Sequence, residues 1–127
     1  MAVAIVNTPN APAPIGPYSQ AVRAGDTLYV SGMIGLDPAS GQLVAGGVAA
    51  EAERVFASLA AIAAAAGGSL ANALKLTIYL TDLANFGVVN EQMMRACSAP
   101  YPARATVGVK ELPRGAAVEI DAVLYLG

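Results

Sequence analysis

The sequence lacks residues on which many catalytic and metal sites depend. Its 127 residues include no histidine and a single cysteine, Cys97. The absence of histidine excludes histidine-based triads and imidazole acid–base pairs, and with only one cysteine no protein metal site is expected. One cysteine cannot form an internal disulfide, which agrees with a reducing, cytosolic compartment. We expect Cys97 to be a small buried apolar side chain.

Charged residues are scarce as well. They make up 13% of the chain, about half of the roughly 25% that is usual for soluble domains. Seven Lys and Arg against nine Asp and Glu give a net charge of −2 and a pI near 4.9, so the basic surface of a nucleic-acid-binding protein is not expected. So few charges cannot cover a monomer well, which leaves a membrane protein or a chain that buries surface against copies of itself.

Long apolar runs are also missing. The least polar stretch, residues 55–68, contains Ser58 and is shorter than the ~20 apolar residues that span a bilayer. The first residues, MAVAIVNTPNAPAP, carry no positive charge and reach Pro9 before any long apolar run, so no secretory signal is predicted. These features predict a soluble, cytosolic homo-oligomer. The length predicts one domain over residues 1–127.

Turn residues and apolar spacing predict the first half of the fold. Four prolines within residues 7–17 predict an irregular lead-in. Gly25-Asp26 predicts a hairpin turn between strands at 18–24 and 27–31, and residues 37–41 predict a second turn. Apolar residues at helical spacing predict a helix from 48 to 66, which Gly67-Gly68 ends.

The second half is predicted to complete a mixed sheet. Alternating residues predict a strand at 74–80, with Leu74, Leu76, Ile78 and Leu80 on the buried face. Thr81 or Asp82 can cap a second helix, whose apolar positions are Phe86, Val89, Met93 and Ala96 or Cys97. Strands at 105–109 and 117–126, with a turn at 112–115, end the chain. This order indicates an α+β fold with both helices on one face of the sheet, and we expect the other face to pack against other subunits.

Two candidate sites lie early in the chain. Residues 15–20, Ile-Gly-Pro-Tyr-Ser-Gln, place the hydroxyl of Tyr18 at the entry to a strand; a turn with a packed tyrosine is the simpler interpretation. Ser31 and Gly32 end the next strand, where a glycine lets the backbone approach a ligand closely. An ordinary strand end would explain that pair equally well.

Two further candidates carry charge. Prolines stiffen the loop before Arg104, and arginine is the side chain that grips a carboxylate with two parallel hydrogen bonds; a structural ion pair is the alternative. Glu119 and Asp121 lie two apart in an otherwise apolar strand, so they share a face. A carboxylate among apolar neighbours has a raised pKa, which suits proton transfer, although it could instead pair with Arg or Lys across the sheet. Asn90 could orient a ligand or make a local cap.

Together these segments resemble the reactive intermediate deaminase (Rid, also called YjgF) family, formerly described as translation inhibitors or L-PSP endoribonucleases. The resemblance covers nearly the whole chain and is specific because many short motifs occur in order. They are Gly16-Pro17-Tyr18-Ser19-Gln20-Ala21, Ser31-Gly32, Asp37-Pro38 with Gly41, Ala66-Gly67, Lys75-Leu76-Thr77, Asp82-Leu83 with Phe86, Val89-Asn90, Pro102-Ala103-Arg104, Leu112-Pro113 and Val118-Glu119-Ile120-Asp121-Ala122.

The resemblance implies a chorismate-mutase-like α+β fold, a homotrimer with three clefts between subunits, and hydrolysis of short 2-imino acids. It implies that Arg104 binds the substrate carboxylate and that Glu119 positions and deprotonates a water molecule. The imine and the cleft would be held by Tyr18, Ser31 with Gly32, Asn90 and the backbone around Thr106. Proximity and one acid–base group suffice for imines, which hydrolyse unaided, so no metal or organic cofactor is implied.

Some positions depart from the family pattern. Met33 stands where Gln is common, Met93 and Met94 replace aromatic residues, and Thr106 stands where many bacterial members have Cys. The methionines change the volume of the cleft or of the packing and bear on substrate range.

Two other functions are possible for these residues. One is an RNA-cleaving or translation-inhibiting protein, which the acidic pI and the missing histidine oppose. The other is a module that binds a small carboxylate at Arg104 without turnover.

Overall fold

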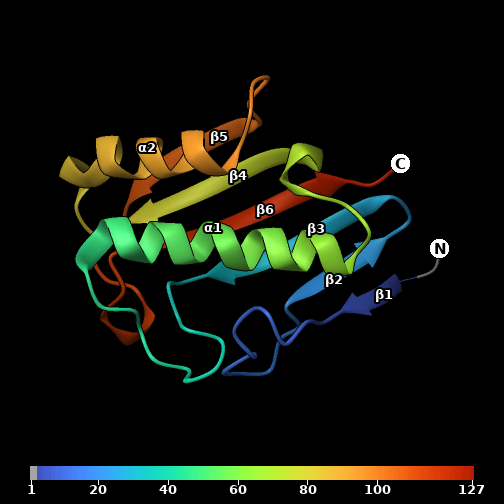
Figure 1. The fold of residues 1–127 in the computed structure, drawn as a ribbon, viewed down its shortest axis with the longest axis horizontal. Coiled ribbons are helices and arrows are strands. Elements are labelled where there is room, and N and C mark those ends of the chain that lie inside the picture. Colours follow the sequence, from blue (N-terminus) through green and yellow to red (C-terminus); the bar gives the residue numbers. More distant parts are fainter. Residues whose placement is uncertain (1–2) are drawn as a thin grey trace.

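A computed structural model describes residues 3–127, and it contains a six-stranded sheet with two helices on one face (Figure 1). The strand order is β1-β2-β3-β6-β4-β5. Only β4 and β5 run parallel, while the other neighbours are antiparallel. The elements are β1 (Val3–Val6), β2 (Ala21–Ala24), β3 (Thr27–Met33), α1 (Gly47–Ala65), β4 (Ala73–Leu80), α2 (Phe86–Ala96), β5 (Ala103–Gly108) and β6 (Val118–Tyr125).

This arrangement confirms the predicted α+β fold with a mixed sheet and both helices on one face. Neither helix in the described part of the chain has the length and apolar character needed to cross a membrane. Within residues 3–127, three short 3₁₀ segments connect the main elements, at Leu70–Asn72, Leu83–Asn85 and Pro113–Gly115.

The first helix ends where its glycines predict. Gly67 has a left-handed φ of 89°, a conformation that glycine adopts without a steric penalty. Its N–H donates to the carbonyl of Ala64, and the N–H of Gly68 donates to the carbonyl of Ala63. These two bonds form a Schellman motif, which satisfies carbonyls that the helix leaves free and turns the chain toward β4.

The core lies between the sheet and the helices. Every second residue of β6 is buried there, and these are Val118, Ile120, Ala122 and Leu124. They pack with one face of α1, which contributes Val55, Phe56, Leu59 and Ile62. Cys97 is part of this core, as expected of a small apolar side chain, and burial raises the pKa of its thiol.

The opposite face of the sheet is not covered by any described element. Residues that alternate with the core positions point to this bare face, and several are large and apolar. About half of each side chain is exposed for Tyr29, Tyr125 and Ile5, which come from three different strands. Large exposed apolar patches are typical of surfaces that bind a partner.

Some predicted details differ from the structure. The strand predicted at 18–24 begins at Ala21, and the sequence pattern missed β1 altogether. The strand predicted from 105 begins at Ala103. Leu74 and Phe86, predicted as buried positions, are exposed. Leu74 lies at a shift in the pairing of β4 with β6, and Phe86 turns toward Arg104.

Candidate active site

Arg104 is held in a fixed orientation on the edge strand β5. Its Nη1 donates to Oδ1 of Asn90 on α2 and lies 3.7 Å from the sulfur of Met93. The guanidinium carbon lies 4.9 Å from the centre of the Phe86 ring, a cation–π contact. Phe86, Asn90 and Met93 are three or four residues apart and therefore share one side of α2.

One edge of the Arg104 guanidinium remains free. Within residues 3–127, Nε and Nη2 make no hydrogen bond and the side chain forms no ion pair. The structure therefore does not support an intrachain ion pair as the role of Arg104. Two adjacent N–H groups on one edge match the two oxygens of a carboxylate, and Asn90 and Phe86 hold the plane that carries them.

A pocket of about 410 Å³ opens beside this arginine. Its size falls in the range of small-molecule sites. Residues of α2, of the loop that follows it and of β5 line the pocket, namely Asn90, Met93, Met94, Tyr101, Pro102 and Arg104. Met93 and Met94, two of the departures from the family pattern, thus lie at the pocket. Met33 instead lies in the core, so that departure changes packing and not this pocket.

Thr106 lies two residues after Arg104 on the same face of β5. Its hydroxyl is covered and has no hydrogen-bond partner within the described residues, so contact with a ligand would have to use the backbone here. β5 is an edge strand, and its outer backbone groups have no neighbouring strand to pair with. Backbone donors and acceptors next to Arg104 are therefore free.

Glu119 and Gly32 form a second cluster, on the bare face of the sheet. A Cβ atom on Gly32 would lie 3.0 Å from Cδ and 3.1 Å from Oε2 of Glu119, so any larger residue would push the carboxylate away. The glycine after Ser31 is thus explained by the place that Glu119 occupies. Within residues 3–127, Glu119 has no ion-pair partner, which removes the cross-strand ion pair as an intrachain explanation.

The surroundings of Glu119 favour its protonated form. Burial raises the pKa of this carboxyl, and the charge of Asp121 on the same face raises it further. Asp121 accepts a hydrogen bond of 2.9 Å from the hydroxyl of Tyr79 on β4. That bond, with burial and the two carboxylates, raises the pKa of the Tyr79 phenol. A carboxyl with a raised pKa holds a proton more readily than an ordinary glutamate does, which suits a role in proton transfer.

Tyr18 and Ser31 are linked through the loop that precedes β2. The hydroxyl of Ser31 donates to the carbonyl of Ser19 at 2.6 Å, so here it holds the loop. Gln20 is 2% exposed; its amide accepts from the N–H of Thr8 and donates to carbonyls of Thr8, Ala11 and Pro12. These bonds fix the proline-rich segment, and Tyr18 remains about half exposed at its end.

The two clusters lie on opposite faces of the sheet. Arg104 is level with Leu76, which faces the core, whereas Glu119 is level with Tyr79 on the bare face. β4 separates their strands, and the register offsets them by three residues, so their Cα atoms are roughly 14 Å apart from strand spacing and rise. The structure brings Arg104 together with Asn90, and Glu119 together with Gly32, but it does not bring the two groups together within one chain.

Sequence reasoning missed several residues of the site. It treated Phe86 as a core position, and it assigned no role to Tyr101, Gln20 or Tyr79. The spacing of Phe86 and Asn90, four residues apart, is a signal that they share a helix side. No local pattern indicates the contacts of Gln20 or Tyr79. The hydrogen-bond partners of Gln20 lie 8 to 12 residues away in the chain, and the partner of Tyr79 lies 42 residues away.

Comparison with known proteins identifies the family. The model of the family described as Endoribonuclease L-PSP matches residues 8–126. The mouse protein named 2-iminobutanoate/2-iminopropanoate deaminase is 48% identical over 123 residues, which are 97% of this chain and 91% of the mouse protein.

Solved structures agree with the sequence comparison. The structure of RidA from an Antarctic Psychrobacter has a TM-score of 0.93 at 48% identity, covering 96% of this chain and 98% of that one. E. coli TdcF, solved with bound serine, has a TM-score of 0.91 at 35% identity and covers 98% of this chain and 99% of that one. The chain therefore belongs to the L-PSP endoribonuclease family, the reactive intermediate deaminase (Rid) family that its motifs resemble.

Proposed function

We propose that this protein hydrolyses short 2-imino acids to 2-keto acids and ammonia. The observation that carries the proposal is the free Nε and Nη2 edge of Arg104 at a small pocket, in a chain 48% identical to a protein named 2-iminobutanoate/2-iminopropanoate deaminase. A 2-imino acid has a carboxylate next to an electrophilic C=N carbon. It therefore needs a cation for the carboxylate and an aimed water for the carbon.

Arg104 supplies the cation in this mechanism. Its free guanidinium edge binds both carboxylate oxygens, while Asn90 and Phe86 keep the plane from rotating. Fixing the substrate by its carboxylate places the C=N carbon at a defined distance from the groups that act on it, and such orientation is a large part of many rate enhancements. Backbone groups of β5 near Thr106 would bind the rest of the substrate.

Glu119 moves the protons. Its carboxylate takes a proton from water as the water oxygen bonds to the imine carbon and the C=N electron pair moves to nitrogen. The nitrogen takes this proton and then a second one, which the new hydroxyl group gives up by way of Glu119. The C–N bond then breaks, and ammonia leaves as the C=O bond forms. The raised pKa of Glu119 suits this exchange because the carboxylate accepts a proton more readily than that of an ordinary glutamate. Tyr18 and Ser31 would border the cleft.

The proposed site is built from two chains. One chain places Arg104 and Glu119 on opposite faces of its sheet, so one group must come from a neighbour if both act on one substrate. The bare apolar face, with Tyr29, Tyr125 and Ile5, is a surface that a neighbour could cover. A homotrimer with a cleft at each of its three interfaces satisfies both requirements, and light scattering that gives a stable monomer at micromolar concentration would contradict it.

The substrate class has support from the family. E. coli TdcF was solved with bound serine, a small molecule that also carries a carboxylate. A binding module without catalytic activity would use the same arginine. Such a module would be stabilised by the ligand but would not convert it, whereas the enzyme would turn its substrate over. We also propose a cytosolic location, because a single cysteine cannot form an internal disulfide and agrees with a reducing compartment.

An oxidase-coupled assay tests the function. An amino-acid oxidase generates 2-imino acids in situ, and release of the keto acid is measured with and without the protein. We expect faster release for short substrates such as 2-iminobutanoate. Equal rates with and without the protein, together with stabilisation by small carboxylates, would favour the binding module.

A further inference from the structure

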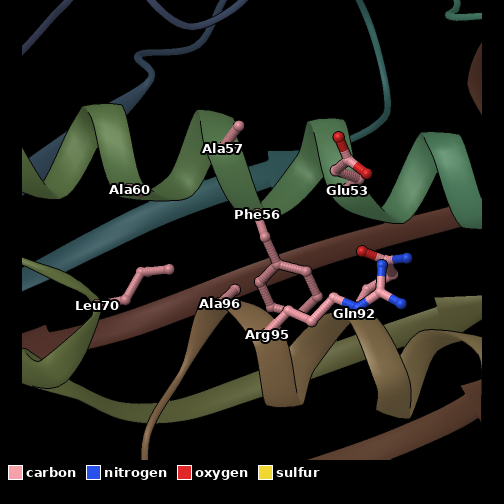
Figure 2. A pocket seen from close by; sticks show the side chains of 8 residues that line it. All are labelled: Glu53, Phe56, Ala57, Ala60, Leu70, Gln92, Arg95 and Ala96. Atoms are coloured by element: carbon pink, nitrogen blue, oxygen red, sulfur yellow. The ribbon is translucent and has the colours of Figure 1, made fainter.

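A second pocket lies in the groove between α1 and α2, away from Arg104. Figure 2 shows it between the two helices, and its volume is about 340 Å³. Its lining shares no residue with the Arg104 pocket. The two helices cover one face of the sheet, so the groove opens on the side opposite the bare face and would stay open when that face is covered by a neighbour.

Gln92 is an unpartnered polar group in this pocket. The residue as a whole is only 8% exposed, and its amide makes no hydrogen bond to any described residue. Its amide atoms are not fully covered, so they reach the surface of the pocket and are available to a ligand. Gln92 lines the pocket, so a ligand there could accept from its NH₂ group or donate to its oxygen.

The same end of the groove carries two opposite charges. Figure 2 shows the carboxylate of Glu53 on α1, and the amide of Gln92 and the guanidinium of Arg95 on α2, at one end of the pocket. Glu53 and Arg95 are both exposed and do not form an ion pair with each other. Each charge is therefore free to bind a group of opposite sign on a ligand.

The other end of the pocket is apolar. The ring of Phe56 forms its centre, and Leu70 lies at the end away from Glu53 (Figure 2). Ala60 and Ala96 line the walls between them, and their small side chains leave room for an aliphatic group. The pocket thus has one charged end with both signs and one apolar end.

We propose that this groove binds a free α-amino acid with an aliphatic side chain. The ammonium group binds Glu53, the carboxylate binds Arg95 and the NH₂ of Gln92, and the aliphatic side chain lies on Phe56 toward Leu70. A simple carboxylate or amine would use only one of the two charges. The site is separate from the Arg104 cleft and does not depend on the deaminase reaction.

Calorimetric titration of L-leucine into the Arg104→Ala variant tests the proposal, because that variant removes the carboxylate site of the cleft. We expect saturable binding with one site per chain and a Kd below about 10 mM. Glu53→Gln and Arg95→Gln, added to Arg104→Ala, should each weaken binding about 10-fold or more, since charge-assisted hydrogen bonds are lost. Gln92→Leu should also weaken it. 4-Methylpentanoate, which lacks the ammonium group, should bind more weakly and be insensitive to Glu53→Gln.

Three results would overturn the proposal. They are the absence of saturable heat, an unchanged Kd in both charge variants, and L-leucine binding that occurs in the parent but vanishes in Arg104→Ala. Glu53 and Arg95 are exposed, so these variants keep the test valid even if Gln92→Leu fails to fold. As a control, Glu53→Gln alone should retain the parent's deaminase rate.

Discussion

Replacing Arg104 by lysine isolates the geometry of the proposed carboxylate clamp. Lysine keeps the positive charge but has a single nitrogen on a flexible stem, whereas arginine offers a planar pair of donors. In the structure Nη1 is used by Asn90, and the Nε and Nη2 edge is free. The substitution therefore removes both the anchored plane and one of the two bonds to a bound carboxylate.

The expected loss follows from that one bond. A hydrogen bond to a charged group contributes roughly 1.5–3 kcal/mol, so losing one should lower kcat/KM about 10- to 100-fold. Arg104→Ala should lower it further, since the charge is lost too. Both variants should fold and assemble as the parent does, because the side chain is exposed and its contacts lie at the pocket, not in the core.

The oxidase-coupled assay measures this loss, with melting curves and light scattering on the same samples. Arg23→Lys is a matched control: Arg23 is paired with Asp26 at 3.6 Å near the hairpin turn, and this variant should keep the parent's rate. If both Arg104 variants retain the parent's rate, the clamp is wrong. If they unfold instead, the arginine has a structural role.

Three other outcomes are expected. Burial and the charge of Asp121 raise the pKa of Glu119, so the folded protein holds this proton more tightly than the unfolded chain does. Ionising Glu119 therefore costs stability as the pH rises through its pKa in the folded protein. Glu119→Gln should raise Tm at neutral pH, and the gain should fade by about pH 4, near the ordinary pKa of glutamate. A constant gain at every pH would refute this. Gln20→Ala leaves backbone groups of residues 8–12 unpaired and should lower the free energy of unfolding in urea by about 1–3 kcal/mol; no change would mean that the loop is held by other contacts. The purified protein should leave RNA intact on gels, and cleavage that persists after stringent purification but disappears in Glu119→Ala would revive the ribonuclease alternative.

Local patterns were sufficient for most of the fold. The α1 helix follows from apolar residues at helical spacing and from Gly67, whose left-handed φ ends it. β6 follows from strict alternation, which also places Glu119 and Asp121 on one face. β1 was missed because its residues, VAIV, are all apolar and show no alternation, so only its pairing with β2 reveals it as a strand.

The arrangement of the site could not be predicted in the same way. The motifs name Arg104 and Glu119 together, but whether they face each other depends on the register of three strands. The pairing of Leu76 with Arg104 and of Tyr79 with Glu119 puts them on opposite faces. The sequence shows neither pairing, because both join residues far apart in the chain.

The central claim is that each active site takes Arg104 from one chain and Glu119 from another. The Arg104→Ala variant and the Glu119→Gln variant are each expected to be nearly inactive on their own. In the test, the two variants are unfolded together, the mixture is refolded, and its deaminase activity is measured. In randomly mixed trimers about one quarter of the interfaces would combine an intact Arg104 with a neighbour's intact Glu119. The mixture should therefore recover up to about a quarter of the activity of parent protein refolded alone. A mixture no more active than the separate variants, although light scattering and mass spectrometry show mixed oligomers, would contradict the claim.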